Sequence, residues 1–143
     1  MCEEDALRWI VALVALAGLL AASAALREHY RTDASPCSIN EKWDCGIVNH
    51  SPYAVQGPVP VAVIGMVGYL LLGVLALMRA WKFAFAAAAM GLAYSLYLTH
   101  IEASVLQIWC IYCVTSLAII SLITLLTLVM AVRRDKPAMA HKS

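Results

Sequence analysis

Residues 103–132 read ASVLQIWCIYCVTSLAIISLITLLTLVMAV, and none of them carries a charge. A run of this length can cross the hydrocarbon core of a bilayer, about 30 Å thick, as an α-helix that rises about 1.5 Å per residue. Three further apolar runs precede it, and none of the runs alternates polar with apolar residues as a membrane strand would. The pattern predicts an all-α membrane protein, a bundle of four transmembrane helices at about 9–26, 59–78, 82–100 and 105–132.

The composition also indicates a protein of the lipid bilayer. The chain has 143 residues, of which 63% are hydrophobic and 13% charged, and its mean hydropathy is +0.80. This is more apolar than a soluble domain can bury. Four spans of about 20 residues leave room for short connections, so residues 1–143 are predicted to form a single integral membrane domain. The net charge of +1 argues against a nucleic-acid partner, and the start MCEED lacks the basic residues of a signal peptide.

Lysine and arginine residues are distributed unevenly between the two predicted ends of the bundle. With four spans, the N-terminus, the turn RAWK and the C-terminal tail share one side of the membrane, and the loop at residues 27–60 lies on the other. The first side carries Arg8, Arg79, Lys82, Arg133, Arg134, Lys136 and Lys142, and the second carries Arg27, Arg31 and Lys42. Because positive charge accumulates on the cytoplasmic side, the termini are predicted to be cytoplasmic and the loop to face outward.

Four of the five cysteines fall on the predicted outer side. Cys37 and Cys45 lie in the loop stretch PCSINEKWDC, and Cys110 and Cys113 lie at the outer start of the last span. Disulfides form in oxidising compartments, which the outer side would be. Cys2 lies on the reducing side and is interpreted as a free thiol near a chain terminus.

The motif CIYC at residues 110–113 brings two thiols close together. At positions i and i+3 they share one helical face near a helix N-terminus, where the helix dipole favours the thiolate that attacks disulfides. Two alternatives stand beside this redox interpretation. The pair could be small buried side chains, or zinc ligands, although His100 is the nearest histidine and a closed zinc site needs four ligands. Trp109 completes the WC..C pattern of thioredoxin, but the alternating strands and helices of that fold are missing.

The loop pair strengthens the redox interpretation. Cys37 and Cys45 could form a purely structural disulfide, but this would not explain a second pair of cysteines at the lipid boundary. Two dithiols at different depths favour a relay, in which thiol–disulfide exchange carries electrons from an aqueous thiol to an acceptor dissolved in the membrane. A quinone has that solubility.

The order of the cysteines, with Ser51 after the loop pair and WCIYC on the last span, resembles the vitamin K epoxide reductase family. The similarity is closest to the bacterial members that oxidise protein thiols, and it runs from about Trp9 to Val132. It implies one role for each cysteine. Cys37 would exchange with a thioredoxin-like partner, Cys45 would shuttle electrons inward, Cys110 would be the residue that Cys45 attacks, and Cys113 would meet the quinone.

Other positions bear on the quinone site. Ser51 matches a loop serine beside the family's active site, and a turn cap is its alternative role. The animal enzymes bind vitamin K through an Asn and a Tyr, and this chain has Val61 and Leu117 at those positions. A respiratory quinone, ubiquinone or menaquinone, is therefore expected rather than vitamin K epoxide. Tyr94 and Tyr97 on the third span could hydrogen-bond a quinone carbonyl or anchor their helix at the membrane interface.

The resemblance implies a membrane thiol:disulfide oxidoreductase that supports disulfide-bond formation and uses no metal. It also implies a separate thioredoxin-like periplasmic partner, and a multi-pass position in the bacterial inner membrane with the active site facing the periplasm. Three alternatives remain. The first is another four-helix disulfide oxidase, which places its C-x-x-C pair before the loop pair. The others are a vitamin K reductase of the endoplasmic reticulum and a non-enzymatic membrane protein with structural disulfides.

Overall fold

The computed structural model describes residues 2–32 and 39–140, with side chains up to residue 133. Cys37 lies outside the described residues. The elements in chain order are α1 (Cys2–Tyr30), α2 (Cys45–His50), the 3-10 turn η1 (Pro52–Ala54), the strands β1 (Val55–Gln56) and β2 (Val59–Pro60), α3 (Val61–Leu77), α4 (Trp81–Ile101), the π-helical turn η2 (Glu102–Leu106) and α5 (Ile111–Ala140).

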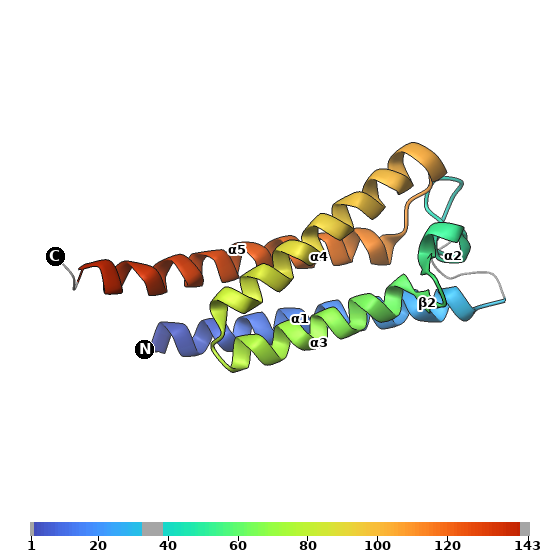
Figure 1. Cartoon of the computed structure of the whole chain (residues 1–143). Helices are drawn as coiled ribbons and strands as arrows, with labels where there is room; N and C mark the ends of the chain where they lie inside the picture. The colour runs from blue at the N-terminus through green and yellow to red at the C-terminus, as the bar shows by residue number, and fades with distance from the viewer. Residues whose placement is uncertain (1, 33–38, 141–143) are drawn as a thin grey trace.

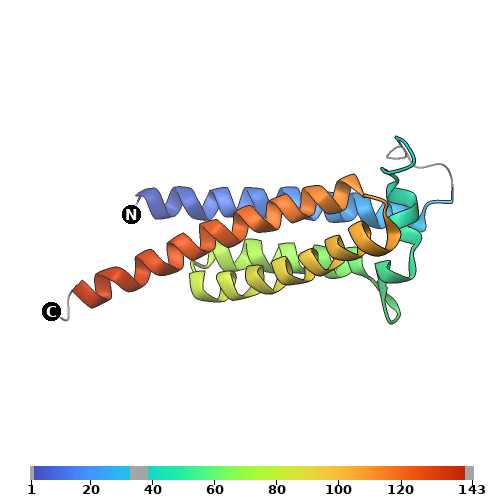
Figure 2. The same cartoon turned by 90° about the horizontal axis from the view of Figure 1, so that it is seen from above.

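The long helices α1, α3, α4 and α5 form an elongated bundle (Figure 1). Helix α1 packs against α3 and α5, and α4 packs against α5 and α3. The start of α1 and the end of α5 lie at one end of the bundle, whereas α2 and the β1–β2 hairpin lie at the other, as both views show (Figures 1 and 2). The start of α5 and the loop that carries Cys45 are thereby brought to the same end.

Small residues on α1 allow α3 to approach closely. The buried positions of α1 recur every three or four residues and include Val11, Ala15, Gly18, Ala22 and Ala25. Such spacing lets helix backbones meet where lipid gives no hydrophobic drive for association. The approach is closest at Gly18, where a Cβ atom would stand 2.4 Å from a ring carbon of Tyr69 on α3. The Tyr69 hydroxyl in turn donates to the Ser116 carbonyl of α5 at 2.9 Å, so one side chain links three helices.

Polar contacts tie the first turn of α1 to the rest of the bundle. The acidic side chains of this turn each meet a partner: Asp5 pairs with Arg79, Glu4 accepts the indole N–H of Trp81 at 3.2 Å, and Glu3 pairs with Arg133. Acidic residues also suit the positive end of the helix dipole. The terminal end of the bundle is therefore held by contacts to the α3–α4 turn, to α4 and to α5.

The helices have the length and composition of membrane spans. Among the described residues, three segments are long and apolar enough to cross a bilayer: Cys2–Tyr30, Trp81–Leu106 and Ile111–Arg133. Helix α3 has 17 residues, which is shorter than these. Large apolar side chains are exposed along the bundle, among them Leu13, Leu20, Val67, Phe83 and Leu125. The all-α prediction is confirmed and the helices fit a membrane protein, whereas the fourth span stays a prediction.

The last apolar run is divided where sequence analysis placed one helix from about residue 105. The π-helical turn η2 ends at Leu106, and Gln107 takes a left-handed conformation with φ of 56° that stops the helix. Trp109 then forms a parallel β-bridge with Trp43, so its backbone is not free to join a helix. Helix α5 consequently begins at Ile111.

Candidate active site

The two cysteines of the CIYC motif lie at the start of α5. Cys110 precedes the helix, and its carbonyl accepts the N–H of Val114 at 3.0 Å, as an N-cap residue does. Cys113 lies in the first turn. Both are free thiols, Cys110 fully buried and Cys113 half-buried. Sequence analysis predicted both cysteines within one helix. In the structure Cys110 instead caps the helix and Cys113 lies in its first turn, and the two side chains still hydrogen-bond each other.

Hydrogen bonds favour the thiolate form of Cys110. The thiol of Cys113 makes the largest contribution to lowering the pKa of Cys110, and the backbone N–H of Cys113 and the amide of Asn49 act in the same direction. Burial and the negative charge of Glu102 oppose them, but the pKa still falls below its ordinary value. Because the thiolate is the species that attacks a disulfide, Cys110 is prepared for thiol–disulfide exchange.

Cys45 is positioned against Cys110 by the short helix α2. Asp44 caps this helix, its side chain accepting the N–H of Ile47 at 3.2 Å, so Cys45 becomes the first helical residue. Cys45 is fully buried and disulfide-bonded. Together with Val48 and Cys110 it forms a buried cluster separate from the main core of the bundle. Cysteines from the loop and from the start of α5 are therefore brought together in one dry environment.

A two-stranded clamp holds the loop next to the CIYC motif. The N–H of Asp44 donates to the Trp109 carbonyl at 3.0 Å, and the N–H of Trp109 donates to the Lys42 carbonyl at 2.7 Å. The indole rings of Trp43 and Trp109 also face each other with centroids 6.2 Å apart. The clamp residues lie one to three positions from a cysteine in the chain, so the clamp holds the loop of Cys45 beside Cys110.

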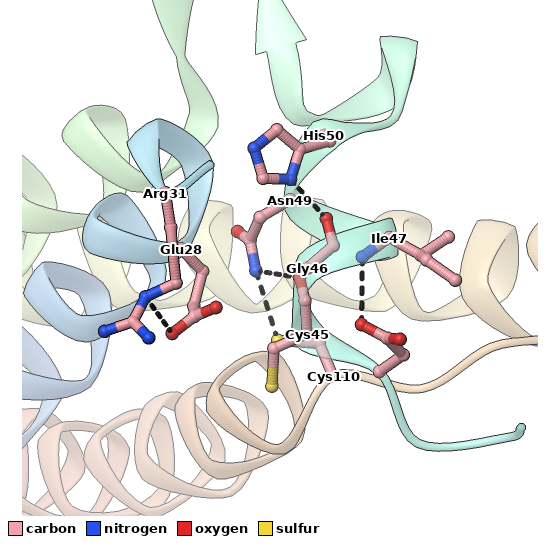
Figure 3. A network of polar contacts seen from close by, with 9 residues as sticks. Glu28, Arg31, Cys45, Gly46, Ile47, Asn49, His50 and Cys110 are labelled. Carbon is pink, nitrogen blue, oxygen red and sulfur yellow. Dashed lines mark hydrogen bonds and ion pairs between the residues drawn. The ribbon is translucent and has the colours of Figure 1, made fainter. Parts of the chain in front are cut away.

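Asn49 connects the two cysteines directly, as Figure 3 shows. Its side-chain amide donates to the Cys45 carbonyl at 2.8 Å and to the Cys110 sulfur at 3.5 Å. The backbone carbonyl of Asn49 accepts a hydrogen bond from Nδ1 of His29 on α1 at 2.6 Å. Sequence analysis gave Asn49 no functional role. The signal for it is its position four residues after Cys45, which places both residues on one side of a helix.

Glu102 supplies a carboxyl group to the same site. Its side chain is 3% exposed, and Oε2 accepts the backbone N–H of Cys110 at 3.3 Å. It also hydrogen-bonds the side chain of Cys113. Sequence analysis missed this residue too, although it is the only Asp, Glu, Lys or Arg between Lys82 and Arg133. An isolated carboxyl group in so long an apolar stretch is by itself a sign of function.

A cavity of about 470 Å³ opens beside the cysteines, between the helices. This volume is in the range of small-molecule sites. Of the residues predicted to contact a quinone, four line it: Cys113, Ser51, Val61 and Tyr94. The Tyr94 hydroxyl is buried and has no hydrogen-bond partner among the described residues. The cavity is thus mainly apolar, with a thiol and a phenol available at its wall.

The other predicted contacts lie elsewhere. Leu117 packs against the main core, and the Tyr97 side chain is 54% exposed with its ring stacked on Tyr94. Neither residue is part of the cavity wall. Ser51 lines the cavity and also donates to the Val48 carbonyl at 2.7 Å, so it combines the two roles weighed for it. No group of three or more His, Cys, Asp or Glu side chains that could hold a metal occurs in the described ranges.

A comparison with known families adds an independent observation. Residues 9–128 match the model of the vitamin K epoxide reductase family. The matched range includes the loop, the CIYC motif and every residue of the site described above. A search of curated proteins finds no match.

Proposed function

Because the chain belongs to the vitamin K epoxide reductase family, whose members are membrane oxidoreductases, we propose that it transfers electrons from protein thiols to a membrane quinone. The observation that carries this proposal is the buried cluster that brings Cys45 together with Cys110, beside a cavity that Cys113 lines. It places a disulfide, an attacking thiol and a site for the acceptor next to one another in space. A protein with two structural disulfides would keep Cys110 bonded to Cys113 throughout, whereas the proposed relay needs both residues as free thiols at one stage, which is their form in the structure.

The proposed relay has three exchanges. A thioredoxin-like dithiol first reduces a Cys37–Cys45 disulfide and is itself oxidised to a disulfide. The Cys45 thiolate then attacks Cys110 of a Cys110–Cys113 disulfide, and Cys37 resolves the mixed disulfide, leaving two inner thiols. A quinone finally accepts two electrons and two protons, which gives a hydroquinone and restores the Cys110–Cys113 disulfide.

The cavity wall supports a respiratory quinone as the acceptor. Family members use quinone-type electron carriers in general. The buried Tyr94 hydroxyl can donate a hydrogen bond to a quinone oxygen, and Ser51 lies on the same wall. Val61 contributes an apolar side chain where the animal enzymes have an amide. We therefore propose ubiquinone or menaquinone as the acceptor, and not vitamin K epoxide.

The arrangement of the bundle supports the proposed location. Both terminal helices reach the same end, and α2 with Cys45 lies at the other (Figure 1). We propose four spans, with α3 as the shortest, in the inner membrane of a bacterium. The termini are then cytoplasmic, and the cysteine site faces the periplasm, where a separate thioredoxin-like protein can reach the loop.

Quinone absorbance in detergent-solubilised protein tests this function. Wild type and Cys113→Ala would be given a reduced thioredoxin-like protein and, in separate assays, a short-chain ubiquinone or menaquinone, with Cys2→Ala as the matched control. We expect wild type and Cys2→Ala to consume quinone. The rate should be at least a hundredfold lower in Cys113→Ala, because the thiol next to the quinone is gone. If folded wild type consumes neither ubiquinone nor menaquinone, the proposed function is wrong.

A further inference from the structure

Glu102 is a buried acid that the relay described above does not use. Its carboxyl group is almost entirely removed from solvent, although it lies at the end of a helix where a side chain could readily turn to water. Burying a carboxylate without a charged partner is energetically unfavourable. Its contacts are the Cys110 backbone N–H and the Cys113 side chain. The group therefore faces the redox pair at considerable energetic cost.

The local backbone directs this side chain to the cysteines. Glu102 is the first residue of the π-helical turn η2, and its own N–H still bonds the carbonyls of Leu98 and Thr99. The chain then reverses at Gln107 and returns to Glu102 with Cys110, which lies eight residues after Glu102 in the sequence. The contact between the Glu102 carboxylate and the Cys110 N–H thus closes the segment from residue 102 to residue 110.

A purely structural role does not require a carboxyl group here. The Cys110 N–H needs one acceptor, which the amide oxygen of a glutamine would supply without a buried charge. The second contact, to the Cys113 thiol, is different because a thiol donates to a carboxylate and can pass its proton along that bond. Glu102 and Cys113 also line the same cavity.

We propose that Glu102 is a catalytic residue that carries a proton from the Cys113 thiol to the quinone. This inference rests on the proposed function and adds the proton path to it. The Cys113 thiol gives its proton to the Glu102 carboxylate, and the resulting thiolate transfers electrons to the bound quinone. The protonated Glu102 then delivers that proton to the quinone oxygen. No metal or further redox group is needed.

The step balances in atoms and electrons. The reduced site holds Cys113 as a thiol and Cys110 as a thiolate, and together they give two electrons when the S–S bond forms. The quinone takes those electrons with two protons, one through Glu102 from Cys113 and one from water at the outer end of the bundle. The products are a Cys110–Cys113 disulfide, a hydroquinone and an ionised Glu102 ready for the next cycle.

Two substitutions of Glu102 separate proton transfer from simple support. Glu102→Gln keeps the size and the acceptor for the Cys110 N–H but cannot take up a proton, whereas Glu102→Asp keeps the acid on a shorter side chain. Glu41→Gln, at an exposed position of the loop, is the matched control. Dithiothreitol would serve as the electron donor and short-chain ubiquinone as the acceptor, so the assay bypasses the protein partner.

A proton carrier and a structural residue predict opposite orders of activity. If Glu102 carries the proton, Glu102→Gln should reduce quinone turnover by about 100-fold or more, the scale of general acid–base catalysis, and Glu102→Asp should retain more activity than Glu102→Gln. Glu41→Gln should match wild type. If Glu102→Gln retains as much activity as Glu102→Asp or more, or falls by less than tenfold, the proposal is overturned.

A second readout keeps the proposal testable if a variant folds poorly. Exchange between Cys45 and Cys110 can be followed without quinone, by trapping the mixed disulfide, and it should proceed in Glu102→Gln at close to the wild-type rate. Loss of this exchange along with turnover would assign Glu102 to the support of the site and refute proton transfer. Failure of the proposed function looks different, because wild type itself would then not reduce any quinone.

Discussion

Replacing Gly18 with alanine tests the closest helix contact in the bundle. The added Cβ would lie 2.4, 2.5 and 2.6 Å from three atoms of the Tyr69 ring, distances that no real contact permits. The ring is 5% exposed and cannot swing outward without leaving the interface. It must shift, and the hydrogen bonds of its hydroxyl to Ser116 would then break.

The expected cost follows from these contacts. Overpacking a buried site costs about 1–3 kcal/mol, and the two lost hydrogen bonds add about 1 kcal/mol each. Alanine recovers about 0.5–1 kcal/mol through its greater helix propensity. Gly18→Ala should therefore lower the free energy of unfolding by roughly 2–4.5 kcal/mol. Because Tyr69 and Ser116 both line the cavity, quinone reduction should fall in the same variant.

Unfolding in mixed detergent micelles, followed by helical circular dichroism, measures this cost. Gly73→Ala on α3 is the control, since its Cβ would meet only the Ala15 Cβ at an ordinary 3.8 Å. That variant should be as stable as wild type or slightly more so. The double variant Gly18→Ala with Tyr69→Leu should lose less than the sum of its single changes, because the smaller side chain removes the clash. Equal stability of Gly18→Ala and Gly73→Ala would refute the argument.

Two predictions concern Cys110. Asn49→Leu removes the donor to its sulfur and to the Cys45 carbonyl, and should slow exchange between Cys45 and Cys110 about tenfold in a quenched alkylation assay, the equivalent of about 1.4 kcal/mol; an unchanged rate would contradict the bridging role. The lowered pKa of Cys110 predicts that its thiolate persists at a lower pH than that of an ordinary cysteine. Ultraviolet titration of Cys2→Ser protein should show this step, and Cys113→Ala should move it to higher pH, whereas an unmoved step would exclude Cys113 as the main cause.

Much of the fold follows from apolar periodicity, but the interruption of the last run does not. Composition and run length predict the helices at residues 9–26, 59–78 and 82–100 because an apolar stretch in lipid has few alternatives to a helix. Residues 107–110 belong to the same uncharged run, yet they leave the helix to meet Trp43, which is more than sixty positions earlier in the chain. No local signal encodes a partner at that distance. The start of α5 could therefore be predicted only if the position of the loop that carries Trp43 were already known.

The site divides in the same way. Cys45, Cys110 and Cys113 can be proposed from spacing and side of the membrane, since their chemistry is specific to the residue type. Asn49 is an ordinary polar residue whose importance depends on the sulfur that it contacts. Glu102 stands out in the sequence as a lone charge, but its contact with Cys113 is set by the fold. Tyr97 and Leu117 were predicted as quinone contacts from their place in the sequence, and they lie outside the cavity wall in the structure. One residue of rotation along a helix, about 100°, is enough to make that difference.

The backbone clamp between the loop and Trp109 also sets how often the site can open. Two hydrogen bonds of about 1 kcal/mol each must break before Cys45 can leave Cys110, which corresponds to a separated population of roughly one molecule in thirty. Motions of loops on the microsecond to millisecond scale can sample such a state many times within one turnover. The loop cysteine is thus held next to its inner partner most of the time and exposed to solvent briefly. Under the proposed relay, such a bias favours the return of electrons to the membrane over their loss to chance disulfides and other oxidants outside.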